Sequence, residues 1–331
     1  MSNGAPEKLT FFCELSSFDL IKLFSNQQLY TQLQLLKATI SLGILDFSDE
    51  RASIVQHLNK HNIPVIAWQL LSKDEGYWYN IGNASEAVSG YEKFLKWTKK
   101  HNLRWAGLGV DIEPDISEIH NLMSNRIRII PALFKRLFRK KCFDSACKEY
   151  HSLVSRMQND GYLVDSYEFL FMDDDRKAGS CILGRILGVT DVPSNRRVLM
   201  LYSSFFRPYG VAVLCNYACG ADSVAVGITG GGVEFPGVKS APLNWDEFSR
   251  DLRLTRRSCD DIHVFSLEGC TAQNFMEPLI SFDWNLAVTQ PQPLTFMLKI
   301  ARVISRVILW LTAHPFLSGL VTGLLVAYIL L

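Results

Sequence analysis

Residues 105–114 carry the most informative pattern in this chain, and they read WAGLGVDIEP. Aliphatic residues alternate in this segment with glycines and acids, and a period of two is typical of a β-strand with two different faces. The aliphatic positions are Leu108, Val110 and Ile112. The other face would carry Gly107 and Gly109, followed by Asp111 and Glu113. We therefore expect a strand with one face that ends in two carboxylates.

Short β-rich runs of this kind recur along the chain, with stretches between them that are long enough for a helix. The eight runs are Leu9–Leu15, Thr39–Asp46, Pro64–Leu71, Ala106–Glu113, Tyr167–Asp173, Arg197–Ser204, Ser223–Thr229 and Ile262–Glu268. Helical candidates between them include Glu86–Lys100, Ala146–Asp160 and Trp245–Ser258. Alternating strands and helices form parallel βαβ units, and eight such units close a barrel. The sequence predicts an α/β fold, a (β/α)8 TIM barrel over residues 1–290.

The composition is that of a folded globular protein. The chain has 331 residues, of which 48% are hydrophobic and 20% charged, and this balance excludes wholesale disorder. A formal net charge of +1 gives no overall attraction for nucleic acid, so no nucleic-acid partner is expected. Eight scattered cysteines lack the spacing of a disulfide scaffold or a metal-ligand set. We expect them to be mainly reduced, and we expect no cofactor and no metal.

The composition changes after the proline-punctuated residues 290–293. Lys299, Arg302 and Arg306 recur there at i, i+3 and i+7 among apolar residues, which predicts an amphipathic helix that lies in a membrane interface with one basic stripe. Residues 291–331 are thus predicted to be a linker, an amphipathic segment and a hydrophobic membrane tail.

The last part of this tail has the length of a transmembrane helix. Residues 308–331 contain no Asp, Glu, Lys or Arg, and about 20 apolar residues span a bilayer. A helix broken at Pro315 would leave a segment that is short for a full span. We expect a single-pass or monotopic C-terminal anchor, with the barrel in the cytoplasm by the positive-inside rule. The basic connection of residues 114–145 is either a solvated amphipathic helix or a second contact with an anionic membrane.

The strand that ends in two acids is the strongest candidate for a site. Catalytic groups of α/β barrels collect at the C-terminal ends of the strands, where the loops form a mouth. Asp111 and Glu113 would lie there about 6 to 7 Å apart along one face of the strand. At that distance one charge raises the pKa of the other group, and a protonated acid results.

The segment resembles the strand-four motif of glycoside hydrolase family 18, the chitinase-like barrels, which is written D-G-x-D-x-D-x-E. The matching positions are Ala106, Gly107, Gly109, Asp111 and Glu113. The resemblance implies that Glu113 donates the proton and that Asp111 orients the substrate acetamido group. The first two aspartates of the motif are Ala106 and Gly109 here, so the hydrogen-bond relay behind the pair is missing.

Two later strands extend the comparison. Residues 200–203, MLYS, are similar to the strand-six M-x-Y-D of the family. The resemblance implies that Tyr202 contacts the acetamido group, and Ser203 replaces the aspartate. The tryptophan that ends strand eight in the family is Leu267 or Glu268 here, a departure from a standard chitinase. If Glu268 faces the lumen, it could act with Glu113 as in a conventional two-carboxylate glycosidase.

Other polar and aromatic residues at strand ends or in the adjoining loops are predicted to bind substrate. These residues are Glu14, Asp46, Trp68, Gln69, Trp78, Asp173 and Glu268. Flat aromatic rings suit the apolar face of a sugar, or equally a membrane interface. The acids could alternatively cap loops and helices.

The leading hypothesis is a glycoside-hydrolase-like enzyme that acts on a glycoconjugate or a glycolipid at a membrane, with Glu113, Asp111 and Tyr202 as catalytic residues. One alternative is a catalytically inactive barrel that binds a sugar or a protein at a membrane. Another is a metal-dependent phosphodiesterase, since the run Asp173–Asp175 could bind a divalent cation. Such barrels also need histidines at the mouth, whereas the histidines of this chain mostly fall in helices or loops away from strand ends, and none follows the first strand.

Overall fold

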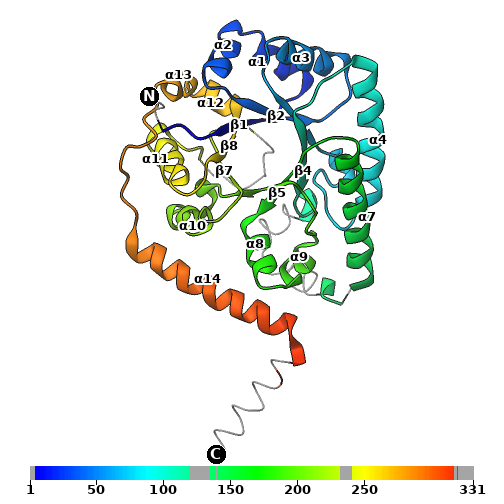
Figure 1. The fold of residues 1–331 in the computed structure, drawn as a ribbon, viewed down its shortest axis with the longest axis vertical. Coiled ribbons are helices and arrows are strands. Elements are labelled where there is room, and N and C mark those ends of the chain that lie inside the picture. The colour runs from blue at the N-terminus through cyan, green and yellow to red at the C-terminus, as the bar shows by residue number, and fades with distance from the viewer. Residues whose placement is uncertain (1–3, 119–134, 139, 232–240, 317–318, 320–331) are drawn as a thin grey trace, which may run out of the picture.

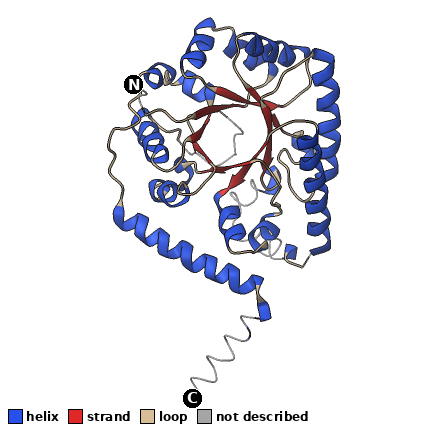
Figure 2. Cartoon of the chain, in the orientation of Figure 1, coloured by secondary structure: helices blue, strands red, loops and turns tan. Residues whose placement is uncertain are grey.

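The computed structural model describes residues 4–118, 135–138, 140–231, 241–316 and 319. Within them, eight parallel strands form a closed barrel in chain order, and β8 pairs with β1 (Figures 1 and 2). The strands are β1 (Lys8–Cys13), β2 (Thr39–Ile44), β3 (Val65–Gln69), β4 (Gly107–Ile112), β5 (Val164–Phe169), β6 (Arg196–Met200), β7 (Ser223–Gly227) and β8 (Asp261–Phe265). The predicted α/β TIM barrel is confirmed.

Helices surround the barrel and cover its outer face (Figure 2). They are α1 (Ser17–Phe24), α2 (Gln27–Leu35), α3 (Asp49–Lys60), α4 (Ala84–His101), α7 (Lys140–Asn159), α8 (Leu170–Lys177), α9 (Ile182–Leu187), α10 (Gly210–Tyr217), α11 (Trp245–Arg256), α12 (Leu267–Ala272), α13 (Met276–Ile280) and α14 (Gln292–Ala313), with short 3-10 turns η1 (Lys73–Glu75) and η2 (Ser203–Phe206). The three helices predicted from periodicity correspond to α4, α7 and α11. In α4, Tyr91 and Phe94 are buried, as one apolar helix face requires.

The fifth strand lies earlier in the chain than predicted. It was expected at Tyr167–Asp173, but β5 covers Val164–Phe169 and α8 begins at Leu170. The apolar residues 169–172 continue the pattern of the strand without a break, so periodicity alone does not locate its end. Asp173 is therefore a residue of the first turn of α8, where a carboxylate suits the positive end of the helix dipole.

The interior of the barrel is filled by side chains from alternate strand positions. Its inward-facing cluster consists of Phe12, Trp68, Tyr167, Val198, Met200, Ala225 and Phe265. Tyr167 crosses the lumen to Ser41 on β2, and their hydroxyl oxygens lie 2.6 Å apart. Gly109 allows this crossing, because a Cβ at position 109 would lie 2.3 Å from the Tyr167 hydroxyl oxygen. Leu108, Val110 and Ile112 belong instead to the outer core, so the predicted two faces of β4 are confirmed.

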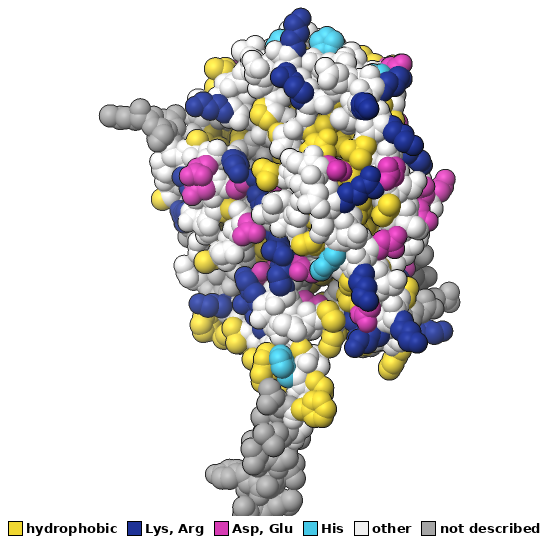
Figure 3. Space-filling view, turned by 45° about the vertical axis from the view of Figure 1, so that its right-hand side comes forward, with side chains coloured by type: hydrophobic (Ala, Val, Ile, Leu, Met, Phe, Trp, Pro, Cys, Tyr) yellow, Lys and Arg dark blue, Asp and Glu magenta, His cyan; other side chains and the backbone are white. Residues whose placement is uncertain are grey.

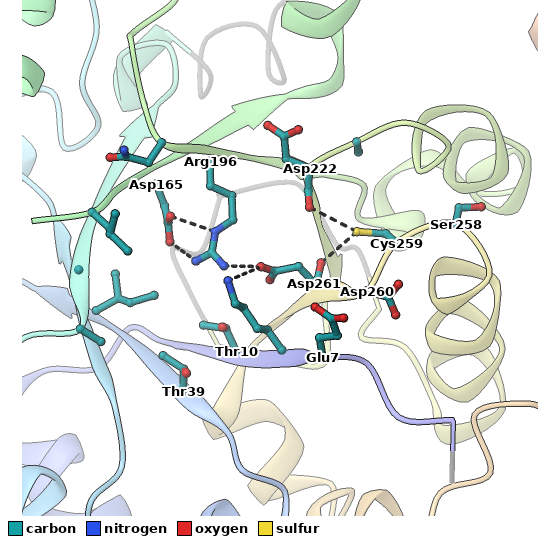
Figure 4. A pocket seen from close by; sticks show the side chains of 17 residues that line it. Glu7, Thr10, Thr39, Asp165, Arg196, Asp222, Ser258, Cys259, Asp260 and Asp261 are labelled. Carbon is teal, nitrogen blue, oxygen red and sulfur yellow. Dashed lines mark hydrogen bonds and ion pairs between the residues drawn. The ribbon is translucent and has the colours of Figure 1, made fainter. Parts of the chain in front are cut away.

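A cavity of about 670 Å³ opens at the N-terminal ends of the strands (Figure 4). Arg196 at the start of β6 forms ion pairs there with Asp165 on β5 and Asp261 on β8. This end of an α/β barrel usually serves stability, and the acids that point inward here already have a cationic partner. The cavity thus lies at the opposite end of the barrel from Asp111 and Glu113.

Helix α14 packs along α8 and α10 below the barrel (Figure 1). Arg302 and Arg306 do not form the predicted membrane-facing stripe, because they turn inward to ion pairs with Asp173 and Asp174 of α8. Within the described residues, no helix combines the length and apolar character needed to cross a bilayer. Most of the predicted span at 308–331, and much of the basic connection at 114–145, lie outside the described residues.

Candidate functional site

Asp111 and Glu113 lie at the C-terminal end of β4. Asp111 is buried, and its Oδ2 accepts a hydrogen bond of 3.1 Å from Nε1 of Trp68 on β3. Burial, and then the neighbouring Glu113 carboxylate, raise the pKa of Asp111 well above its usual range. Glu113 is partly exposed, and burial raises its pKa to about 8. Both acids therefore favour the protonated form at the barrel mouth.

The Oδ1 of Asp111 is buried and accepts no hydrogen bond from a donor among the described residues. The group beside it is the Glu113 carboxyl, which has no hydrogen to donate when it is ionised. A proton on either carboxyl would let it donate to the other, and burial and the neighbouring Glu113 both shift the pKa of Asp111 upward, toward that protonated form.

Two further acids come together from β1 and β8. Glu14 follows β1, and its backbone N–H donates a hydrogen bond of 3.3 Å to Oε1 of Glu268 in the first turn of α12. Burial raises the pKa of Glu14 to about 8 and that of Glu268 to about 7. The Tyr77 hydroxyl donates to Oε1 of Glu14 and partly opposes the rise in the pKa of that acid. The side chains of Glu14 and Glu268 are partly exposed.

Tyr202 belongs to the same group of residues. Its ring lies 5.7 Å from that of Phe265, and its pKa is raised well above the usual value by burial and then by the charges of Asp111 and Glu113. Ser203, at the position of the aspartate in the resembled motif, points elsewhere and donates a hydrogen bond to Asp251 on α11. The structure thus brings Glu14, Asp111, Glu113, Tyr202 and Glu268 to one mouth.

Positive charge among the described residues compensates the acids of the mouth only weakly, since Lys73 opposes the rise in the pKa of Glu14 less than the other contributions do. None of the four acids of the mouth forms an ion pair with a residue that the structure describes. Within the same residues, no three His, Cys, Asp or Glu side chains are grouped so as to hold a metal ion. The arrangement therefore suits proton transfer from a raised-pKa acid more than the binding of an anion.

Three predicted substrate-binding residues form their contacts with other residues than the acids of this group. Asp46 accepts hydrogen bonds from the buried Arg51, including one of 3.1 Å from Nη2. Burial alone would raise the pKa of Asp46, but the hydrogen bonds from Arg51 and Ser48 hold it well below the usual range. Gln69 follows Trp68 on the opposite face of β3, and Asp173 pairs with cations of α8 and α14. Their predicted role in binding substrate stays a prediction.

The aromatic residues of the loop after β3 are buried within the protein, and the predicted role of Trp78 in binding substrate stays a prediction. Trp78 is buried with its ring 5.3 Å from that of Tyr77, and Tyr79 stacks on Tyr150 at 5.6 Å. Tyr77 adopts a left-handed φ of 66°, which is uncommon for an aromatic residue, and it reaches Glu14. The sequence pattern indicated Trp78 in this loop but not Tyr77, because only the folded chain brings Tyr77 and Glu14 together.

The fold and the site together define a (β/α)8 barrel with four acidic side chains grouped at its mouth. No protein-family model and no curated protein sequence match the chain. Among solved structures, the chain is similar to a GH18 chitinase from Pseudoalteromonas aurantia, with 10% identity, coverage of 83% of this chain and 99% of that chain, and a TM-score of 0.47.

It is also similar to the PgaB (BpsB) glycoside hydrolase domain from Bordetella bronchiseptica, with 12% identity, coverage of 85% and 100%, and a TM-score of 0.49. A D-allulose 3-epimerase from Methylomonas sp. matches with 11% identity, coverage of 91% and 98%, and a TM-score of 0.42. At such low identity these likenesses concern the barrel fold alone. Function has to be argued from the mouth itself.

Proposed function

We propose that the protein is a glycosidase-type hydrolase that acts on a glycoconjugate, with Glu113 as the general acid. The observation that carries this proposal is the raised pKa of Glu113, about 8, at a partly exposed position beside the buried Asp111. A general acid has to hold its proton at the working pH and release it to the substrate. Glu113 is the more accessible member of the pair, so it delivers the proton to the leaving oxygen.

Asp111 and Tyr202 complete the proposed reaction centre. The hydrogen bond from Trp68 fixes the Asp111 carboxyl, which would position the sugar or stabilise positive charge on the ring or its acetamido group. Tyr202 would hydrogen-bond near the anomeric carbon. Glu268, next to Glu14, supplies a second acid at the mouth, so a mechanism with two carboxylates remains an alternative route to the same reaction.

One observation favours a second candidate, a barrel that binds a sugar without cleaving it. The resembled motif has an aspartate at position 109, and here that space is occupied by the Tyr167 ring, which would lie within 2.6 Å of a Cβ at this position. The relay behind the acid pair is thus replaced by an aromatic side chain. Loss of such a relay weakens an enzyme more than it weakens a binding protein.

The Glu113→Gln variant separates the two candidates. Turnover of fluorogenic glycosides, including N-acetylglucosaminides, and oligosaccharide binding by calorimetry would be measured for both chains. The enzyme hypothesis expects a loss of at least about 100-fold in turnover with binding retained. It also expects activity in the parent to fall as the pH rises above about 8, as Glu113 loses its proton.

The matched control is Glu118→Gln. Glu118 lies in the same connection but forms an ion pair with Arg136, and its change should leave turnover near the parent value. Equal turnover in the parent and Glu113→Gln would contradict the proposed role of Glu113. Saturable binding with no turnover by the parent would favour the binding barrel.

A further inference from the structure

Helix α14 contacts the barrel through a narrow stripe. The side chains on this stripe are Thr295, Leu298, Arg302, Arg306 and Leu309. They recur every three or four residues, as one face of an α-helix requires. The stripe packs on α8 and α10, and Asn216 of α10 donates a hydrogen bond of 3.0 Å to the Thr295 carbonyl oxygen. Unusually, the buried face of this helix carries its two arginines.

The arginines are neutralised within the protein. Arg302 lies with Nε 2.7 Å from Asp174 and with Nη2 2.5 Å from Asp173, and Arg306 Nε lies 2.6 Å from Asp174. The Arg302 guanidinium also lies 3.6 Å from the centre of the Tyr217 ring, over its face. These contacts fix α14 against the barrel. They leave neither guanidinium free to attract phospholipid headgroups.

The outward face of α14 is apolar. Its exposed side chains include Phe296, Met297, Ile300, Val303, Ile304, Val307, Ile308 and Trp310, with exposed fractions from 40% for Trp310 to 66% for Met297. At 3.6 residues per turn these eight positions fall within an arc of about 160°, on the side of the helix roughly opposite the buried stripe. Figure 3 shows hydrophobic side chains gathered where α14 leads into the C-terminal residues.

We propose that α14 lies in the surface of a lipid bilayer, with this apolar arc immersed and the arginine cluster holding the barrel above it. An arc of this width suits a fluid partner that covers both flanks of a helix, whereas a protein partner normally covers one stripe. Residues 314–331, which follow α14 directly, contain no Asp, Glu, Lys or Arg. The sequence after α14 thus stays free of these charged residues, which favours lipid over a second copy of the chain.

The contact with the bilayer is hydrophobic and not electrostatic. Of the three basic residues in the helix, Arg302 and Arg306 are paired with carboxylates and only Lys299 is exposed. Attachment is consequently expected on neutral phosphatidylcholine vesicles, with little dependence on anionic lipid or on salt. The predicted cytoplasmic side of the barrel stays a prediction.

The test combines vesicle flotation with hydroxyl-radical footprinting of the full chain. Oxidation of Met297 and Trp310, measured by mass spectrometry, reports on α14 locally and not on the tail. Phosphatidylcholine vesicles should protect both residues at least fivefold, while Phe18 on α1, exposed by 78%, stays equally reactive. The Ile300→Glu/Val307→Glu variant should lose this protection and bind at least tenfold more weakly. Lys299→Glu, outside the arc, is the matched control and should change neither.

Four results would overturn the proposal. The chain could fail to float with neutral vesicles, or float only when anionic lipid is present. It could float while Met297 and Trp310 stay as reactive as in solution, which would mean that another segment holds it. The two residues could also become protected without lipid as the protein concentration rises, which would identify the face as a contact between copies of the chain.

Discussion

Replacing Glu113 by glutamine is expected to stabilise the folded protein at neutral pH, although it removes the proposed general acid. Burial raises the pKa of Glu113 from 4.5 to about 8, so between these values the folded chain binds a proton that the unfolded chain has released. Stability therefore falls as the pH rises from 4.5 to about 8. The uncharged glutamine avoids this cost.

The size of the effect follows from the shift. A pH of 7 lies 2.5 above the ordinary glutamate pKa of 4.5, which corresponds to about 3 kcal/mol because each pH step of one is worth about 1.4 kcal/mol. Because Glu113 is partly exposed and water screens its charge, we take about half of this, roughly 2 kcal/mol. At pH 5 the same reasoning leaves less than about 1 kcal/mol.

Urea unfolding of the full chain, followed by tryptophan fluorescence at pH 5, 7 and 8.5, measures this difference. The midpoint of Glu113→Gln should exceed that of the parent by an amount that grows with pH. Glu118→Gln, which loses an ion pair with Arg136, should show no such gain. A midpoint for Glu113→Gln at or below the parent value at pH 8.5, or a gain of equal size at pH 5, would refute the reasoning.

Two other substitutions test the packing inside the barrel and the ion pair of a buried arginine. Gly109→Ala should destabilise the chain by about 1 to 3 kcal/mol, because its Cβ would lie 2.3 Å from the Tyr167 hydroxyl oxygen; an unchanged unfolding midpoint would mean that the ring moves aside freely. Asp46→Asn should cost roughly 2 to 3 kcal/mol at pH 7, because the buried Arg51 loses its charged partner. Since the folded-state pKa of Asp46 is depressed, this loss should begin to shrink as the pH falls below the usual pKa and should disappear only as the pH falls through the depressed folded-state pKa; a loss that does not shrink over this range would contradict the ion-pair explanation.

The barrel and the direction of the acid pair could be predicted because both depend on local periodicity. Alternation along residues 105–114 assigned Asp111 and Glu113 to the same face as Gly109, and β4 has this arrangement. The end of β5 could not be located in the same way. The strand ends at Phe169 and α8 begins at Leu170, but residues 169–172 are all apolar. The hydrophobic pattern therefore does not change where the strand gives way to the helix.

Contacts between distant segments were beyond prediction for a different reason. Arg302 and Asp174 are separated by 128 positions in the sequence. Arg302 lies in an apolar segment and Asp174 in an acidic run, so each alone resembled an ordinary surface charge. Two arginines of the expected basic stripe and two aspartates of the expected acidic run form one ionic cluster, which consists of Arg302, Arg306, Asp173 and Asp174. Tyr77 and Glu14 were similarly joined only by the closure of the barrel.

The protonation of the acids around the mouth bears on which ligands can enter. Burial raises the pKa of Glu14 and Glu113 to about 8 and that of Glu268 to about 7, so the mouth carries little charge near neutral pH and becomes negative as the pH rises above about 8. A glycan with phosphate, sulfate or carboxylate groups would then be repelled under alkaline conditions, whereas a neutral hexose would meet no such barrier at either pH. Neutral sugars are therefore the first to be tried.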